Sequence, residues 1–304
     1  MRERVRKTTE NDIRRRSARL PQGARPRGFT LVELLVVIGV IAVIVAFSVP
    51  AFRSMVGGAR RSREMNAARQ LIVAWTSYAA DAKGQVLPGF KTGLPAYQAN
   101  GDPIPASSYG GGATISARYP WRIARYLGHN FHGLYVNDQE PELSLLENGD
   151  YQKYLYFGSL YPSFGMNSTW VGGDQERYGF LPPPPPNSPP SPFNNFYVSR
   201  LSQVKHAERL LVFASARTDA TSDGRMVEGY FRIDSPAIIS TQWASTYDPA
   251  APSSYGNVSA RQDGETVCAF VGGNVDHKPV DELRDMRYWA NQADAPDWRL
   301  VPGS

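Results

Sequence analysis

Glu33 is the residue whose type and position most clearly call for chemistry. It is the only charged residue in the apolar stretch 29–52. A carboxylate in the apolar core of a membrane costs on the order of 2.5–3.5 kcal/mol, so an ionised Glu33 there needs a counter-charge. The alternative is a glutamate at the membrane interface near a helix start, where the helix dipole favours negative charge.

Outside this stretch, the candidate chemical residues form no complete site. His129 and His132 are three residues apart and could share a helix face. No carboxylate or cysteine lies at matching spacing, so we interpret both as surface or hydrogen-bonded histidines. The single cysteine, Cys268, cannot form an internal disulfide, and we interpret it as a small apolar core residue.

An acidic cluster near the C-terminus contains Asp276, Asp281, Glu282 and Asp285. It lacks the alternating Asp/Asn and Gly pattern of a calcium loop, so we assign no metal or other cofactor and keep the four only as candidate calcium ligands. The sequence has no nucleophile-elbow, phosphate-loop, dinucleotide-binding or zinc-protease motif, and we do not expect an enzyme.

The net charge of +5 suggests nucleic-acid binding, but its distribution argues against that interpretation. Residues 1–28 contain ten Arg or Lys and three Asp or Glu, which leaves 23 basic and 25 acidic residues for 29–304. The net charge after residue 28 is therefore −2. We expect residues 1–28 to be a basic cytoplasmic leader, and we expect no nucleic-acid partner.

Residues 29–52 are long and apolar enough to cross a membrane. A helix of that length reaches roughly 36 Å, against about 30 Å for a hydrocarbon core. The preceding positive charge places the N-terminus in the cytoplasm and the C-terminal domain outside, as in a single-pass membrane protein. A secretory signal differs, because its small residues follow the apolar run.

The helix is predicted to continue amphipathically over residues 53–84. Apolar or small side chains recur there at three- and four-residue intervals, and Lys83-Gly84 is a favourable helix stop. We expect a kink at Pro50 and a looser helix at Gly57-Gly58. The recurring positions are Ala68, Leu71, Ile72, Trp75, Tyr78, Ala79 and Ala82.

Residues 85–304 are predicted to form an extracytoplasmic globular domain of the α+β class. The amphipathic half of the helix must bury its apolar face, and we expect it to pack on a small antiparallel sheet with long loops. A Pro-rich surface loop is expected over 181–192, where eight prolines prevent sheet pairing. The predicted elements are a short helix over 121–127, a strand pair over 151–160, a buried strand over 209–214, a hairpin over 266–275 turned by Gly272-Gly273, and a short helix over 280–290.

The junction Arg27-Gly28-Phe29-Thr30-Leu31-Val32-Glu33 resembles the processing motif of type IV prepilins and type II secretion pseudopilins. The resemblance implies that a membrane-embedded prepilin peptidase cuts between Gly28 and Phe29 and methylates the new amine of Phe29. It also implies that this amine, in the same or a neighbouring subunit, neutralises Glu33 during assembly. Pro50 lies where many pilins of this family carry a helix-loosening proline, and a pilin-like fold is implied.

A second resemblance covers the C-terminal hairpin module, residues 261–290. It is similar to the closing module of large prepilin-like proteins that carry an H-X9-DG signature. Here Gln262 replaces the histidine and Gly272 replaces the aspartate, so that only Gly273 of the three signature residues remains. The strand-turn-strand scaffold is expected, whereas a role that depends on the histidine and aspartate is not carried over.

Two functions from different classes follow from these observations. The first is a pilin-like structural subunit of a type II secretion pseudopilus or a type IV pilus-like filament. Its partners would be prepilin peptidase, other pilin or pseudopilin subunits, the membrane and the inner-membrane assembly platform. The alternative is a membrane-anchored module that binds a surface or a carbohydrate without polymerising. The many aromatic residues of the distal half fit such binding, but core packing explains most of them.

Overall fold

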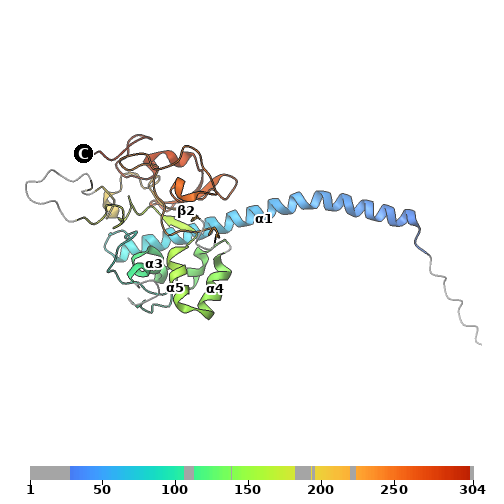
Figure 1. Ribbon diagram of the computed structural model, residues 1–304, viewed down its shortest axis with the longest axis horizontal. Helices are drawn as coiled ribbons and strands as arrows, with labels where there is room; N and C mark the ends of the chain where they lie inside the picture. Colours follow the sequence, from blue (N-terminus) through green and yellow to red (C-terminus); the bar gives the residue numbers. More distant parts are fainter. Residues whose placement is uncertain are drawn as a thin grey trace, which may run out of the picture. The chain divides into compact units, whose positions relative to one another are not determined.

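The structure, a computed structural model, describes residues 28–105, 113–137, 139–181, 193, 196–219 and 224–301 (Figure 1). The chain divides into two compact units. The first ends at Arg53, and the second covers Ser54–Ser304. The basic leader, up to residue 27, and nearly all of the Pro-rich loop, from residue 182 to 192, lie outside the described residues.

Helix α1, Leu31–Asp81, is the longest element and is continuous through Pro50 and Gly57-Gly58. It ends where the sequence predicts. Lys83 has a φ of 54°, its N–H donates to the Ala80 carbonyl, and the N–H of Gly84 donates to the Ala79 carbonyl at 2.8 Å. This is the Schellman arrangement, which satisfies the last carbonyls of a helix.

A four-stranded antiparallel sheet lies at the centre of the second unit. Its strands are β1 (Phe164–Met166), β2 (Leu211–Ser215), β3 (Glu265–Phe270) and β4 (Val275–Pro279), in the order β1-β2-β3-β4. The predicted buried strand and the predicted C-terminal hairpin are therefore confirmed. Gly273, with a φ of 87°, occupies the turn between β3 and β4, where a side chain would be strained.

Strands β1, β2 and β3 are buried on both faces, because two hydrophobic cores meet across them, whereas β4 is a partly exposed edge strand. Val267 and Ala269 of β3 face a core shared with the last part of α1, whereas Cys268 and Phe270 face a core built from the C-terminal loops. This alternation is the period of two that a strand imposes. In Figure 1 the helices and the C-terminal segments lie on opposite sides of β2. The predicted α+β class is confirmed.

The predicted amphipathic stripe of α1 supplies one side of the first core. Ala68, Leu71 and Trp75 are completely buried there, and Ile72 is almost so; Ala79 is also completely buried. Residues between them, such as Val73, are exposed. This part of α1 therefore buries one face only, as an amphipathic helix does.

A layer of short helices covers the same core: α2 (Ala113–Ala117), α3 (Tyr119–Leu127), α4 (Gln139–Gly149) and α5 (Tyr151–Leu160). The short helix predicted over 121–127 is confirmed as α3.

The strand pair predicted over 151–160 is wrong, since these residues form helix α5. The Asp150 side chain accepts a hydrogen bond from the Lys153 N–H at 3.1 Å and so caps the helix N-terminus. The Trp121 indole N–H donates to the Leu155 carbonyl at 2.7 Å, and its ring fills the space beside Gly158. These tertiary contacts outweigh the strand preference of the aromatic residues.

The C-terminal segment forms 3₁₀ turns in place of the predicted helix over 280–290. They are η4 (Glu282–Arg284) and η5 (Met286–Tyr288), and the Trp289 indole donates to the Leu283 carbonyl at 2.8 Å. Three further 3₁₀ turns are η1 (Gly128–Leu134), η2 (Leu201–Gln203) and η3 (Pro252–Tyr255). Long loops join these elements, as expected.

Candidate processing and assembly site

Gly28 and Phe29 lie immediately before helix α1, and both are exposed. A Cβ atom added to Gly28 would meet no described atom within 4 Å. The fold of the described chain therefore does not require glycine at position 28. A requirement for glycine there would have to come from another molecule that handles the Gly28–Phe29 bond.

Thr30 and Glu33 form a capping box at the start of α1. The Thr30 N–H and hydroxyl donate to Glu33 Oε2 at 2.9 and 2.8 Å, and the Glu33 N–H donates to Thr30 Oγ1 at 3.2 Å. The arrangement satisfies helix N–H groups that have no partner within the helix. Sequence analysis did not identify it, although the Thr-x-x-Glu spacing is its usual signal.

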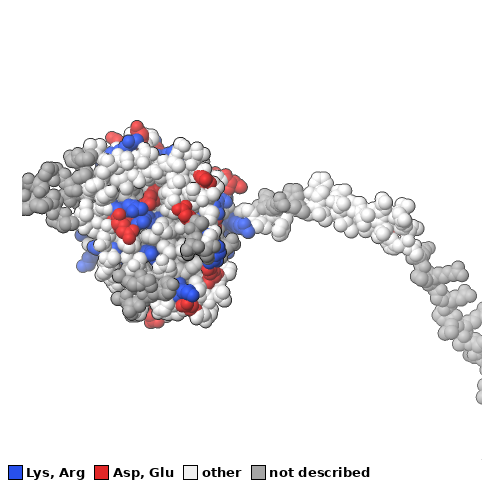
Figure 2. All heavy atoms as spheres, viewed as in Figure 1, with Lys and Arg blue, Asp and Glu red and all other residues white. Residues whose placement is uncertain are grey.

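The first part of α1 presents a continuous apolar surface. Residues Leu31–Ser48 have a mean hydropathy of 2.9 and none of them is buried. The large apolar side chains among them are 44–78% exposed. Figure 2 shows the described part of this segment almost without charged side chains. By length and composition it is a helix that can cross a membrane.

The C-terminal module contacts α1 through a buried carboxylate that sequence analysis missed. Glu64 is 1% exposed, and its Oε1 lies 2.8 Å from Arg261 Nη2 and accepts from the Ser215 hydroxyl at 2.6 Å. Gln262 donates to the other oxygen of Glu64 at 2.9 Å. The residue that replaces the signature histidine thus binds the helix.

Arg261 carries this network further into the domain. Its guanidinium lies 3.1 Å from Glu228 and donates to the Ser163 carbonyl at 2.8 Å. Burial alone would raise the pKa of Glu64, but the Arg261 charge and the hydrogen bonds outweigh it and hold that pKa below its ordinary value. No local pattern identifies such a pair, because Glu64 and Arg261 are 197 positions apart.

The other two signature positions are structural here. Gly272 lies in the turn after β3, where its N–H donates to the Ala207 carbonyl at 2.7 Å. A Cβ atom at Gly272 would approach that carbonyl oxygen to 3.2 Å. Gly273 takes the positive φ of the turn. The hairpin scaffold is therefore retained without the signature aspartate.

The four candidate calcium ligands each face a donor of this chain. Within the described residues, no three His, Cys, Asp or Glu side chains gather closely enough to hold a metal ion. These residues stay candidate ligands from the sequence only, and no metal is assigned to them. The donors are Lys278 for Asp276, Tyr255 for Asp281, Lys278 for Glu282 and Arg287 for Asp285.

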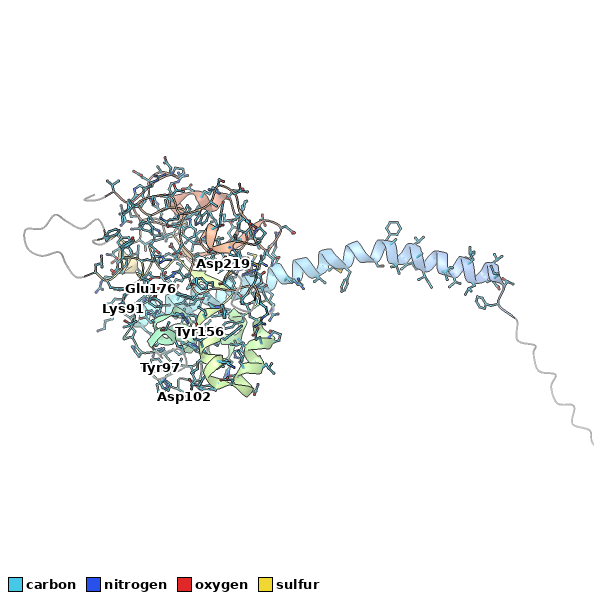
Figure 3. The ribbon with its side chains drawn as sticks, viewed as in Figure 1. Lys91, Tyr97, Asp102, Tyr156, Glu176 and Asp219 are labelled. Carbon is cyan, nitrogen blue, oxygen red and sulfur yellow. The ribbon has the colours of Figure 1, made fainter. Side chains whose placement is uncertain are left out.

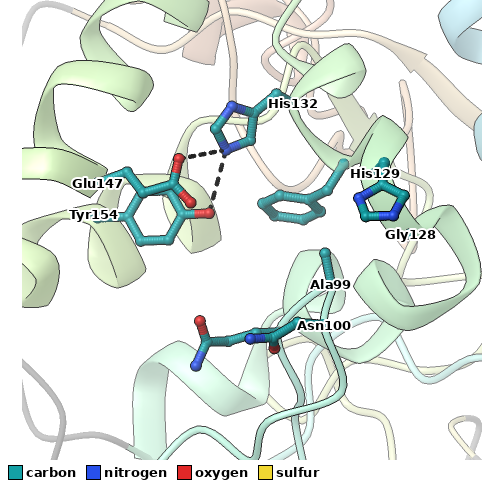
Figure 4. A pocket seen from close by; sticks show the side chains of 9 residues that line it. Ala99, Asn100, Gly128, His129, His132, Glu147 and Tyr154 are labelled. Atoms are coloured by element: carbon teal, nitrogen blue, oxygen red, sulfur yellow. Dashed lines mark hydrogen bonds and ion pairs between the residues drawn. The ribbon is translucent and has the colours of Figure 1, made fainter.

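His129 and His132 both lie in η1 and line a pocket of about 650 Å³ (Figure 4). Folding places the Glu147 carboxylate beside His132, a contact that the spacing in the sequence did not suggest. His132 Nε2 lies 3.4 Å from Glu147 Oε2 and 3.3 Å from the Tyr154 hydroxyl. The interpretation of His132 as a hydrogen-bonded histidine is confirmed.

Cys268 is completely buried in the second core, as its interpretation predicts, and burial raises the pKa of its thiol. Most of the distal tryptophans also belong to the cores. Trp121, Trp170 and Trp289 are completely buried, and Trp243 is 5% exposed. Core packing explains these rings, as expected.

Residues 24–49 match the model of the prokaryotic N-terminal methylation motif. The comparison with curated proteins and the comparison with solved structures both find no match. The matched residues include Gly28, Phe29, Thr30 and Glu33 together with most of the apolar part of α1. The chain therefore carries a prepilin-type N-terminal motif, which implies processing by prepilin peptidase and is consistent with a type IV pilin-like or pseudopilin-like protein.

Proposed function

We propose that the chain is a pilin-like structural subunit that prepilin peptidase cleaves between Gly28 and Phe29 and methylates at Phe29. The mature subunit assembles through α1 into a type II secretion pseudopilus or a type IV pilus-like filament at the bacterial inner membrane. One observation carries the proposal: the methylation motif coincides with a helix whose apolar side chains are not buried by any described part of their own chain.

The apolar part of α1 suits two successive environments. Lipid covers it before assembly, and neighbouring helices cover it afterwards. Gly39, Ala42 and Ala46 recur at three- and four-residue intervals and let another helix approach closely. In lipid such packing, and not the hydrophobic effect, drives helix association.

Glu33 has the capacity to bind a cation of a neighbouring subunit. In the described residues, Oε2 takes both bonds from Thr30 and Oε1 takes none. Cleavage after Gly28 would create a positive amine at Phe29. An ion pair between that amine and Glu33 of another subunit would offset the cost of the carboxylate in an apolar surrounding and fix the axial register of the helices.

Formaldehyde crosslinking in intact cells tests assembly. We expect the native protein to form ladders of crosslinked subunits and Glu33→Gln to form at least about tenfold fewer, a factor that corresponds to losing one charged interaction. Glutamine preserves the capping box, so this variant removes the charge alone. Glu140→Gln, which removes a carboxylate on the exposed surface of the second unit, is the matched control.

Ladders of unchanged intensity in Glu33→Gln would refute the role given to its charge. Monomers alone in native cells would refute polymerisation and favour the membrane-anchored binding module.

A further inference from the structure

Two adjoining hollows in the unit Ser54–Ser304 form a polar cleft that the proposed assembly does not use. They measure about 560 and 250 Å³ and share Arg177, Asp234 and Gln242 as lining residues. Glu176, which lines the larger hollow, is labelled in Figure 3. The larger hollow lies within the range of roughly 300–1,000 Å³ that small ligands occupy.

A buried ion network forms the base of this cleft. Asp174 is completely buried and accepts hydrogen bonds from the Ser168 hydroxyl at 2.6 Å and from Arg232 Nη1 at 3.2 Å. Arg232, 8% exposed at its side chain, lines the smaller hollow. Its Nε–H has no hydrogen-bond partner among the described residues, and the nearest Asp234 oxygen is 4.0 Å away. Because Nε itself is inaccessible to solvent, it does not meet a ligand in the cleft, and Arg232 contributes by holding Asp174 and Glu176 in position.

Planar polar side chains form part of the wall of the cleft, beside Ile238 and Ile239. The Arg177 guanidinium donates to both Asp234 oxygens, through Nε at 3.3 Å and Nη2 at 3.2 Å. The Trp243 indole donates to the Asp234 carbonyl at 2.9 Å. Gln242 is exposed and adds an amide with both donor and acceptor capacity.

An exposed aromatic ring completes the larger hollow. Tyr178 is 47% exposed and stacks on Phe193, with ring centroids 4.2 Å apart and planes at 14°. Its φ of 65° is rare for a residue with a side chain. The turn is held because the Arg177 and Gly179 N–H groups donate to the Asp174 carbonyl at 3.0 and 2.8 Å. The ring is thus positioned before any ligand arrives.

We propose that this cleft binds a neutral saccharide. Around it Arg177 and Arg232 face Asp174, Glu176 and Asp234, so both signs are present and are already paired, which favours neither an anion nor a cation. Hydroxyl groups both donate and accept, and they match a wall that offers both functions. The apolar face of a sugar ring stacks on an aromatic ring such as Tyr178, whose π face attracts the ring's C–H groups.

Saturation-transfer NMR and calorimetry on the full chain test the proposal. The protein is kept in a detergent without a sugar headgroup and is offered maltotriose, cellotriose and chitotriose, with trigalacturonate as the charged comparison. We expect at least one neutral trisaccharide to bind, and Tyr178→Ala and Gln242→Ala each to weaken it at least about tenfold. Tyr151→Ala and Gln70→Ala remove an exposed tyrosine and an exposed glutamine elsewhere and serve as controls.

Four outcomes decide the proposal once circular dichroism shows that every variant is folded. Neutral binding that is lost only in the two cleft variants supports it. Binding of equal strength in all variants overturns the site, binding of trigalacturonate alone overturns the ligand class, and no binding of any trisaccharide overturns both. The measurement does not depend on cleavage or polymerisation, so its failure would leave the proposed function standing.

Discussion

Replacing Glu64 by glutamine should destabilise the globular unit strongly, because it leaves Arg261 without its main counter-charge. Glu64 is 1% exposed, and removing one partner of a buried ion pair costs about 3–5 kcal/mol. Arg261 keeps Glu228 and several carbonyl oxygens, so we expect the lower end, about 3 kcal/mol. For a unit of this size that loss lowers Tm by about 6–12 °C.

Near-ultraviolet circular dichroism of the full chain at pH 7 measures this shift. Glu140→Gln is the control, because Glu140 pairs with Arg63 on the surface, with 42% and 53% of the two side chains exposed. An exposed pair contributes less than about 1 kcal/mol. Glu64→Gln with Arg261→Gln should recover part of the loss, since neither charge is then left unpaired.

The effect should also depend on pH with a definite sign. The folded pKa of Glu64 lies below its ordinary value of 4.5, so its stabilisation is complete above that value and is lost as the pH falls through the folded pKa. The difference in Tm between the native protein and Glu64→Gln should therefore shrink in acid. A Tm shift at pH 7 no larger than that of Glu140→Gln would refute the buried network as a link between α1 and the C-terminal module.

Two further predictions concern the cores. Gly158→Ala should destabilise the protein by about 1–3 kcal/mol, because the new Cβ would lie 2.7 Å from Trp121 Cζ2. The control is Gly149→Ala, whose Cβ would meet nothing within 4 Å and which should leave the Tm of thermal unfolding unchanged or slightly higher. Equal Tm values for the Gly158→Ala and Gly149→Ala variants would contradict the close packing of Trp121 on Gly158. Cys268 should react with N-ethylmaleimide only after unfolding, because burial raises its pKa and excludes the reagent. Labelling of the folded protein within minutes, seen by intact mass, would contradict its burial.

The N-terminal elements could be predicted from the sequence because their signals are local. The apolar run, the stripe with Leu71 and Trp75, and the stop at Lys83-Gly84 each depend on neighbouring residues. The hairpin was also predictable, since the apolar run 266–271 is followed by the glycine pair Gly272-Gly273 and then by Val275.

The helical layer and the buried polar networks were not predictable in this way. Residues 151–160 are rich in strand-favouring aromatic residues but follow a capping aspartate, Asp150, and their packing on Trp121 stabilises the helix. In the sequence Glu64 cannot be distinguished from a glutamate on the surface of a helix. Its partners Ser215 and Arg261 are 151 and 197 positions away. The cleft around Arg177 and Asp234 likewise joins residues 57 positions apart.

The most direct test of the central claim is the N-terminal and intact mass of the protein extracted from membranes. Cleavage predicts a chain that begins at a methylated Phe29. Gly28→Leu should retain the leader, whereas Gly57→Leu, another glycine without neighbours around its Cβ, should be cut normally. A native protein that begins at Met1, or at a residue beyond the apolar part of α1, would contradict the claim.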